Sequence, residues 1–300
     1  MKKKTYLFAL MAMVLTLGSC SDNENGIGGE TSKNIIVSTI IDNMTRVATD
    51  AKGGQTFEEG DEISVYAWTG APTVAPETSE RVVNNAINKL TNGSWVSTPQ
   101  MLWKNNRDKH YFIGVYPVSA ISDLSAGEYT FDETKQVESD LLVAVNKDGI
   151  SYNADEQQTV PLTFTHVMAK LAVNLTYKNQ WGGIPTVEKV VVGNAAKEAT
   201  INYLTKVVTP SATAKEDFSL PEITENTKYV SVIIPQEEVK QLTIVIGGKN
   251  FVYDNGTPFK LESGKITTVN LEVGRDEIKL GDVKITNWED GSTFSGEALN

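Results

Sequence analysis

This 300-residue sequence has one cysteine, Cys20, and two histidines, His110 and His166, which are the residue types most often used as nucleophile, acid–base group or zinc ligand. Since Cys20 is the single cysteine, a disulfide framework and a cysteine-based zinc site are both excluded. Two histidines far apart in the sequence do not suggest a histidine-rich metal site or a histidine relay. We expect His166 to pack as a structural residue bonded to backbone, not to act as a base. Cys20 is therefore the residue with the clearest chemical use.

Cys20 closes a segment with the order of a secretory signal. Basic residues at positions 2–4 precede an apolar run at 6–17, which is too short to span a membrane as a helix. The next residues, Leu17-Gly18-Ser19-Cys20, resemble a bacterial lipobox, in which the cysteine thiol accepts the lipid. We predict a lipoprotein signal peptide at 1–19 and a membrane anchor on Cys20. The alternative is a soluble secreted protein with a chance cysteine at this position.

Residues 20–33 are predicted to form an acidic, glycine-rich tether. Ser21–Asn25 resembles the surface-export signal of Bacteroides-type lipoproteins, and Gly26–Gly29 favours flexibility. A generic polar tether is the alternative. The chain carries 27 Lys and Arg against 38 Asp and Glu, so its net charge is −11, and removal of residues 1–19 with their three lysines takes it to −14. Such a chain repels a phosphate backbone, so no nucleic-acid partner is expected.

Motifs for other chemistry are weak. Gly26–Gly29 follows no strand, so it is not a dinucleotide fingerprint, and Asn146–Gly149 does not have the spacing of a calcium loop. Carboxylates such as Glu58, Glu59 and Asp61 are available for glycoside hydrolysis, but one sequence does not place two of them across a cleft. The sequence therefore predicts no catalytic residue, no metal site, no cofactor, and a protein that is not an enzyme.

The elements that must position these residues are strands. Alternation marks the first strand at 35–41, where one face carries Ile35, Val37, Thr39 and Ile41. The other face carries Ile36, Ser38 and Ile40, so we expect burial on both sides. Further runs rich in Val, Ile, Thr and Tyr are Glu62–Trp68, Tyr111–Tyr116, Leu141–Val145, Leu171–Tyr177, Val187–Val192, Ala199–Leu204, Tyr229–Ile234, Leu242–Ile246, Phe251–Tyr253, Ile266–Val273 and Val283–Asn287.

Turn pairs such as Asn92-Gly93 and Gly247-Gly248 separate these runs, which is typical of all-β antiparallel sandwiches. Only Glu80–Leu90 has a weak helical pattern. The polar run 153–158 suggests a domain boundary near residue 157. We therefore predict an N-terminal β-sandwich at 34–156 and a C-terminal β-sandwich at 157–300.

Four segments in order resemble the fimbrillin-like family, the type V pilin subunits of Bacteroidales. They are Met44-Thr45-Arg46 with Phe57–Tyr66, Trp95 with Met101–Trp103 and Tyr111–Pro117, Leu162–Leu171, and Val283–Gly291. The resemblance implies two transthyretin-like antiparallel β-sandwich domains in tandem. It also implies export as a lipoprotein to the outer membrane and the cell surface or fimbrium.

The resemblance further implies a mechanism of assembly. In many family members a trypsin-like protease cuts after an arginine that follows the first strand, and loss of that strand opens a groove. A strand of a neighbouring subunit then fills the groove. Here Arg46 and Val47 match the cleavage position, and the strand with Ile35, Val37, Thr39 and Ile41 is the displaceable element. The implied partners are other fimbrial subunits, further copies of the chain in a self-polymer, and a ligand on a host or bacterial surface. Arg46 as an ordinary strand-end residue is the alternative, and the choice among stalk, anchor and tip subunit stays open.

The rival hypothesis is a surface glycan-binding lipoprotein of a polysaccharide-uptake system. Its signature is an exposed tryptophan that stacks on a sugar face. Five tryptophans are present, at 68, 95, 103, 181 and 288. Trp181 is the best candidate glycan contact because Asn179–Gly183 has the composition of a loop.

Overall fold

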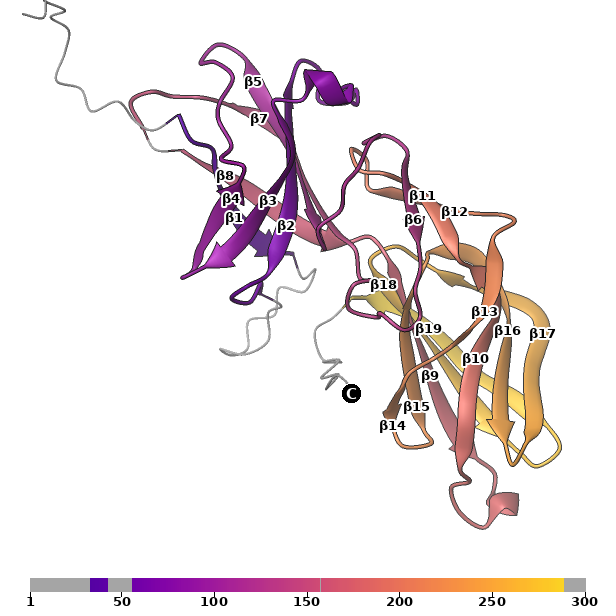
Figure 1. The fold of residues 1–300 in the computed structure, drawn as a ribbon. Helices are drawn as coiled ribbons and strands as arrows, with labels where there is room; N and C mark the ends of the chain where they lie inside the picture. The colour runs from indigo at the N-terminus through magenta and orange to yellow at the C-terminus, as the bar shows by residue number, and fades with distance from the viewer. Residues whose placement is uncertain (1–32, 43–55, 157, 289–300) are drawn as a thin grey trace, which may run out of the picture. The chain divides into compact units, whose positions relative to one another are not determined.

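The computed structural model describes residues 33–42, 56–156 and 158–288, and all of them lie in one compact unit, Thr31–Asn300. These residues form strands and two short 3-10 turns, η1 (Thr78–Glu80) and η2 (Asn179–Trp181), and contain no α-helix. Figure 1 shows the resulting ribbon. The all-β prediction is confirmed. Within the described residues there is no helix with the length and apolar character needed to cross a bilayer.

The first sheet has seven strands in the order β1-β8-β7-β5-β2-β3-β4. Their bounds are β1 Ile36–Ile41, β8 Thr159–His166, β7 Leu142–Ser151, β5 Lys109–Tyr116, β2 Glu62–Thr69, β3 Val83–Thr91 and β4 Ser94–Thr98. All neighbours are antiparallel except β1 and β8, which are parallel. Parallel neighbours need a long connection, and here the entire chain from β2 to β7 lies between the two strands.

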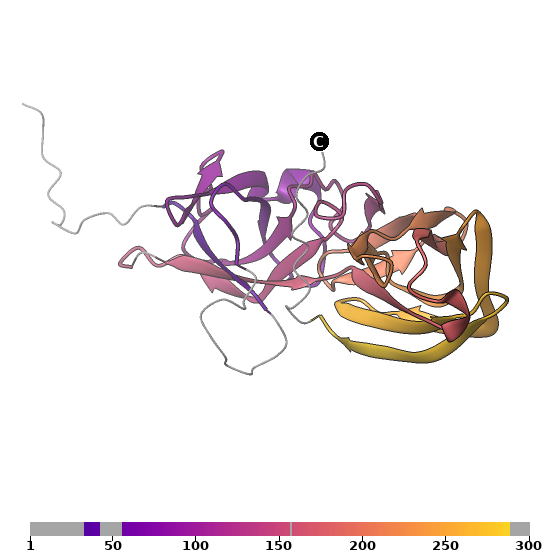
Figure 2. The same ribbon diagram turned by 90° about the horizontal axis from the view of Figure 1, so that it is seen from below.

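Three further sheets are formed by strands of the second half of the chain together with β6 of the first half. A four-stranded sheet has the order β13-β10-β16-β17, and a three-stranded sheet has the order β12-β11-β6. A five-stranded sheet has the order β14-β15-β9-β18-β19, in which β9 and β18 are parallel. Figure 2 shows the last strands of this sheet in yellow. The bounds are β6 Gly127–Thr130, β9 Ala169–Tyr177, β10 Val187–Ala196, β11 Glu198–Asn202, β12 Val207–Pro210, β13 Lys215–Ser219, β14 Glu222–Thr224, β15 Lys228–Ile233, β16 Gln236–Ile246, β17 Lys249–Leu261, β18 Lys265–Val273 and β19 Ile278–Asn287.

The predicted helical pattern at Glu80–Leu90 is wrong, because this segment is the strand β3. A bulge between the β2–β3 pairs Val65–Ala86 and Ala67–Val83 inserts an extra residue, and Asn85 there adopts a φ of 55°. The bulge puts Val83 and Ala86 on the buried face three residues apart. A strand with a bulge thus imitates the spacing of a helix over a short window.

The domain boundary stays a prediction. The structure pairs β8 with β7 and β1, so the strand directly after residue 157 belongs to the first sheet. Conversely, β6 pairs with β11 of the second half. The pairing of β8 favours a division after His166 over one at 157.

Two apolar clusters form the core. The smaller cluster fills the interior of the curved first sheet and includes Val37, Val65, Phe112 and Phe164. The larger cluster joins the sheets of the second half and also takes in Tyr66, Ile113 and Val143 from the opposite face of the first sheet. Central strands β2 and β5 are therefore buried on both faces.

Phe164 provides a test of the smaller cluster. Its ring is fully buried and packs edge-on against Phe57 at 5.1 Å between ring centroids. We expect Phe164→Ala to lower the free energy of unfolding by about 3–5 kcal/mol, because it leaves a cavity. Thr163→Ala, on the exposed face of the same strand, should change it by less than about 0.5 kcal/mol. Urea denaturation measures both, and equal effects would contradict this description of the core.

Candidate functional site

The predicted displaceable strand, β1, lies at the edge of the first sheet. Six consecutive residues pair with β8, from Ile36 opposite Thr159 to Ile41 opposite Phe164. On its other side β1 has no strand-length neighbour among the described residues. The chain around Leu102 approaches only its beginning, through Ile35 N–H to the Met101 carbonyl at 2.9 Å and Trp103 N–H to the Lys33 carbonyl at 3.0 Å. Most of the outer edge of β1 therefore lacks a ladder of backbone bonds to the described chain.

Burial along β1 alternates. Ile35 and Val37 are 2% and 3% exposed, whereas Ile36 is 37% and Ile40 is 65% exposed. The expectation of burial on both faces is thus wrong, because an edge strand of a curved sheet has the core on its inner face only. The buried face is the one that carries the residues of the predicted displaceable element. Thr39 and Ile41, on the same face, are partly buried.

Thr39 is the polar position on this inner face, and it has a defined partner. The Trp95 Nε1–H group donates to Thr39 Oγ1 at 3.0 Å. Trp95 packs edge-on against Phe57, which also contacts Phe164. Trp95 thus contacts β1 directly, and Phe57 links Trp95 to Phe164 of β8. Spacing along the sequence does not show which strands these side chains join.

The inner face of β1 shares an apolar cluster with Met101 and Trp103 and with Val160, Leu162 and Phe164 of the neighbouring strand β8. We call these five the groove residues, because they would line an apolar groove if β1 left. All five side chains are at most 6% exposed and share the core cluster with Ile35 and Val37. Removal of β1 would expose these side chains together with the unpaired backbone edge of β8. A strand with apolar residues at alternate positions would cover these side chains and pair with the backbone edge of β8.

The remaining predicted positions of this mechanism, Cys20, Arg46 and Val47, lie outside the described residues. Asp42 is the last described residue before Arg46, and its N–H donates to the Phe164 carbonyl at 2.8 Å. Arg46 follows four residues later in the sequence.

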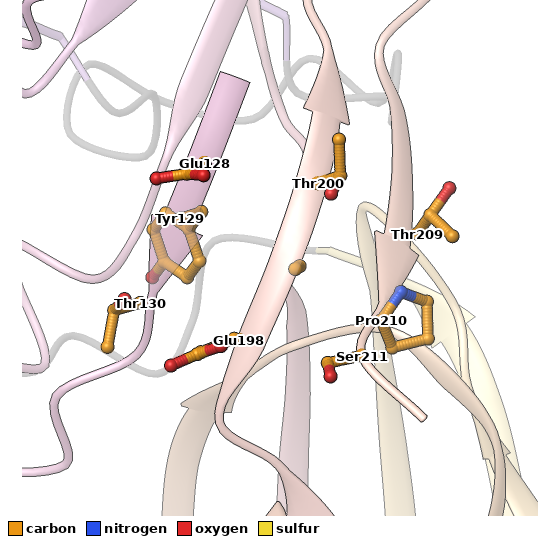
Figure 3. Close-up of a pocket in the computed structure, with 9 residues that line it drawn as sticks. Glu128, Tyr129, Thr130, Glu198, Thr200, Thr209, Pro210 and Ser211 are labelled. Atoms are coloured by element: carbon orange, nitrogen blue, oxygen red, sulfur yellow. The ribbon is translucent and has the colours of Figure 1, made fainter. Parts of the chain in front are cut away.

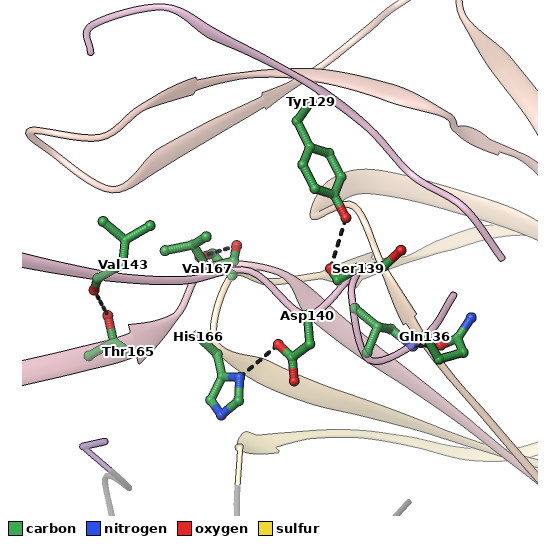
Figure 4. A network of polar contacts seen from close by, with 10 residues as sticks. Tyr129, Gln136, Ser139, Asp140, Val143, Thr165, His166 and Val167 are labelled. Carbon is green, nitrogen blue, oxygen red and sulfur yellow. Dashed lines mark hydrogen bonds and ion pairs between the residues drawn. The ribbon is translucent and has the colours of Figure 1, made fainter. Parts of the chain in front are cut away.

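Both histidines are held in structural arrangements. His166 Nδ1 lies 2.8 Å from Asp140 Oδ1 (Figure 4). The His166 ring stacks on Trp288 at 4.1 Å between ring centroids. One partner of the ring is thus a carboxylate, and the expected bond to backbone stays a prediction. His110 is fully buried and bonded through both nitrogens: Lys104 N–H donates to Nε2 at 3.1 Å, which leaves Nδ1–H to donate to the Asp108 carbonyl at 3.1 Å.

Trp181 is in the short 3-10 turn η2 and not in a strand, in agreement with the predicted loop at Asn179–Gly183. Its ring is half-buried, and its Nε1–H donates to the Val273 carbonyl at 3.0 Å. Phe251 packs against the ring at 5.8 Å and the Arg275 guanidinium lies 5.6 Å from its centre. Trp68, Trp103 and Trp288 are buried, and Trp95 is half-buried. These environments do not favour stacking on a sugar.

A shallow pocket of about 360 Å³ lies over β6, β11 and β12 (Figure 3). Glutamates and hydroxyl side chains dominate its lining, with Glu128, Glu198, Thr200 and Thr209 among them. It contains none of the residues predicted to be functional. Within the described ranges, no group of three or more His, Cys, Asp and Glu side chains could hold a metal ion.

The sequence profile of the fimbrillin-like family matches residues 45–288. The chain belongs to the fimbrillin-like family. Three solved structures share the fold of this fimbrillin-like protein. Candidate cell-adhesion proteins from Bacteroides ovatus and Bacteroides uniformis are each 17% identical, with TM-scores of 0.65 and 0.64; the matches cover 86% of this chain and 98% and 100% of theirs. A fimbrial protein from Bacteroides vulgatus is 13% identical, with a TM-score of 0.52 over 86% of this chain and 100% of its own. None of the curated proteins compared with this chain matches it.

The buried His110 leads us to expect that the stability of the fold depends on pH. Burial lowers its pKa below the ordinary 6.5, so the unfolded chain takes up a proton as pH falls while the folded chain does not. The neutral ring thus stabilises the fold above pH 6.5, and this contribution is lost as pH falls through the lowered pKa. The loss is at most about 1.4 kcal/mol per pH unit for one proton.

His110→Gln tests this, because a glutamine amide has the same acceptor and donor capacity without titrating. The free energy of unfolding, measured in urea at pH 7.5 and pH 5, should fall less in the variant than in the parent chain. Equal falls in both proteins would show that His110 does not contribute to the acid sensitivity.

Proposed function

We propose that this fimbrillin-like protein is a fimbrial subunit or fimbria-associated surface adhesin that assembles by protease-triggered strand exchange. The observation that carries the proposal is the position of β1. It is an edge strand with one hydrogen-bonded neighbour, its inner side chains share an apolar cluster with the groove residues, and it directly precedes the segment that contains Arg46. The family membership supports the same function.

Cleavage after Arg46 would convert β1 from a covalently attached strand into a separate peptide. An attached strand returns to its groove at a high effective concentration, whereas a released strand competes with any other strand on equal terms. Burial of Ile35 and Val37 stabilises each β1–groove complex by roughly 1.5–3 kcal/mol per side chain, which a donor strand with similar residues would match. A donor strand could therefore bind in the groove without any rearrangement of the groove residues.

Head-to-tail addition of this kind does not close on itself, so repeated exchange would build a filament. The partners are other fimbrial subunits or further copies of this chain, and an exposed subunit could bind a host or bacterial surface ligand. The proposal needs neither a cofactor nor a catalytic residue, and the protein is proposed not to be an enzyme.

Cys20 would place the unprocessed protein on the outer membrane and the cell surface through its lipid. Because the lipid is N-terminal to β1, cleavage after Arg46 would leave it on the fragment 20–46. A cleaved subunit would join the fimbrium, and an uncleaved one would remain an anchor. Glycan binding is the less favoured alternative, since the ring of Trp181 packs against Phe251 and Arg275.

Limited trypsin digestion of the chain from Ser21 tests the proposal. We expect a new N-terminus at Val47, followed by a ladder of multimers on an unboiled denaturing gel. The variant Arg46→Ala should remain uncut at this position and monomeric. If the parent chain is cut after Arg46 and stays monomeric, the protein is not a stalk subunit that assembles by strand exchange.

A further inference from the structure

The carboxyl end of β1 lies beside Thr165 of β8, a residue whose hydroxyl also bonds to a lysine from another part of the chain. The register of β1 and β8 places Ile41 opposite Phe164, and the bond from Asp42 N–H to the Phe164 carbonyl continues the ladder. The next position along β8 is Thr165, so Asp42 lies opposite Thr165. Opposed residues of neighbouring strands point to the same face of a sheet. The Asp42 carboxylate therefore shares a face with the Thr165 hydroxyl.

Lys206 reaches the same hydroxyl from the other side. It immediately precedes β12, in a left-handed backbone conformation with φ of 62°, and its Nζ donates to Thr165 Oγ1 at 3.0 Å. The side chain is half-buried. Asp42 and Lys206 thus flank one residue of β8, although they are far apart in the sequence.

The charges around Lys206 are not balanced. Burial lowers its pKa, the nearby charge of Lys147 on β7 lowers this pKa further, and Asp42 raises it. Asp42 is the carboxylate that acts on Lys206, and it directly follows the strand that the proposed function displaces. When β1 leaves with Asp42, Lys206 loses this acid.

We propose that Lys206 selects an acidic residue, so that the strand replacing β1 carries a carboxylate at the position of Asp42. This inference rests on the proposed strand exchange and adds a partner requirement to it. The apolar groove accepts any strand with alternating apolar residues, because burial is non-directional. A charged end of the groove fixes the register and rejects strands with a basic residue there.

Strand peptides provide the test. The chain from Ser21 is given a specific protease site within residues 43–55 and is cut, which leaves β1 bound without a covalent link. Fluorescent peptides of residues 33–43 are then added with Asp, Ala or Lys at position 42, and their binding is followed by fluorescence anisotropy. We expect the Asp peptide to bind about three- to tenfold more tightly than the Lys peptide, with the Ala peptide between them.

Lys206→Met keeps the aliphatic stem and removes the charge, so it should reduce the difference between the Asp and Lys peptides. Lys189→Met, an exposed lysine on β10 in another sheet, is the matched control and should leave the difference unchanged. If Lys206→Met does not fold, the parent chain at high salt replaces it, because salt screens the charges and should also shrink the difference.

The experiment distinguishes a failure of strand exchange from a failure of carboxylate selection. If no peptide replaces β1 in the cut chain, the strand-exchange function itself is overturned. If peptides replace β1 with equal affinity for Asp, Ala and Lys, strand exchange stands and the selection of a carboxylate is overturned. Selection is likewise overturned if Lys206→Met and Lys189→Met change the peptide preference equally.

Discussion

One parallel ladder, between β1 and β8, determines how the first sheet ends and which part of the core can be opened. β8 is paired on its other side with β7, and the start of β7 pairs through Leu142 with His166. Within the described chain, β1 has no such second strand. The inner side chains of β1 complete the apolar cluster, but its backbone is hydrogen-bonded to a neighbouring strand along one edge only. β1 therefore contributes much to burial while its attachment to the sheet is weak.

The strand that receives β1 is firmly connected to the rest of the protein. β8 and β9 are separated only by Val167 and Met168, both buried. At this joint Val167 N–H donates to the Leu141 carbonyl and Gly264 N–H donates to the Met168 carbonyl. The buried Lys170 ammonium lies 4.2 Å from the centre of the Trp288 ring, on which His166 also stacks. Both halves of the chain thus contribute to the support behind β8, which would keep the groove residues in place during the proposed exchange of β1.

Apolar and charged contacts divide the recognition of a strand between them. Ile35 and Val37 contribute affinity through burial, which almost any alternating strand can reproduce. Thr39, through its bond to Trp95, and Asp42, beside Thr165 and Lys206, are positions where chemistry and register both matter. Under the proposed strand exchange, the groove would be permissive along its length and selective at two points, a division that would suit a site where one strand replaces another.

Local sequence patterns predicted the all-β class and twelve strands, β1 among them, because alternation of apolar residues reflects burial in a strand. They also indicated the family through short motifs in a fixed order. They missed β4, β6, β8, β12, β13 and β14, misassigned β3, where a bulge changed the period, and predicted burial on the outer face of β1, where isoleucines at 36 and 40 are exposed. The parallel pairing of β1 with β8, the bond from Trp95 to Thr39 and the bond from Lys206 to Thr165 became visible only in the tertiary structure. These contacts join residues from about 40 to more than 100 positions apart, and local patterning carries no information about which distant strands become neighbours.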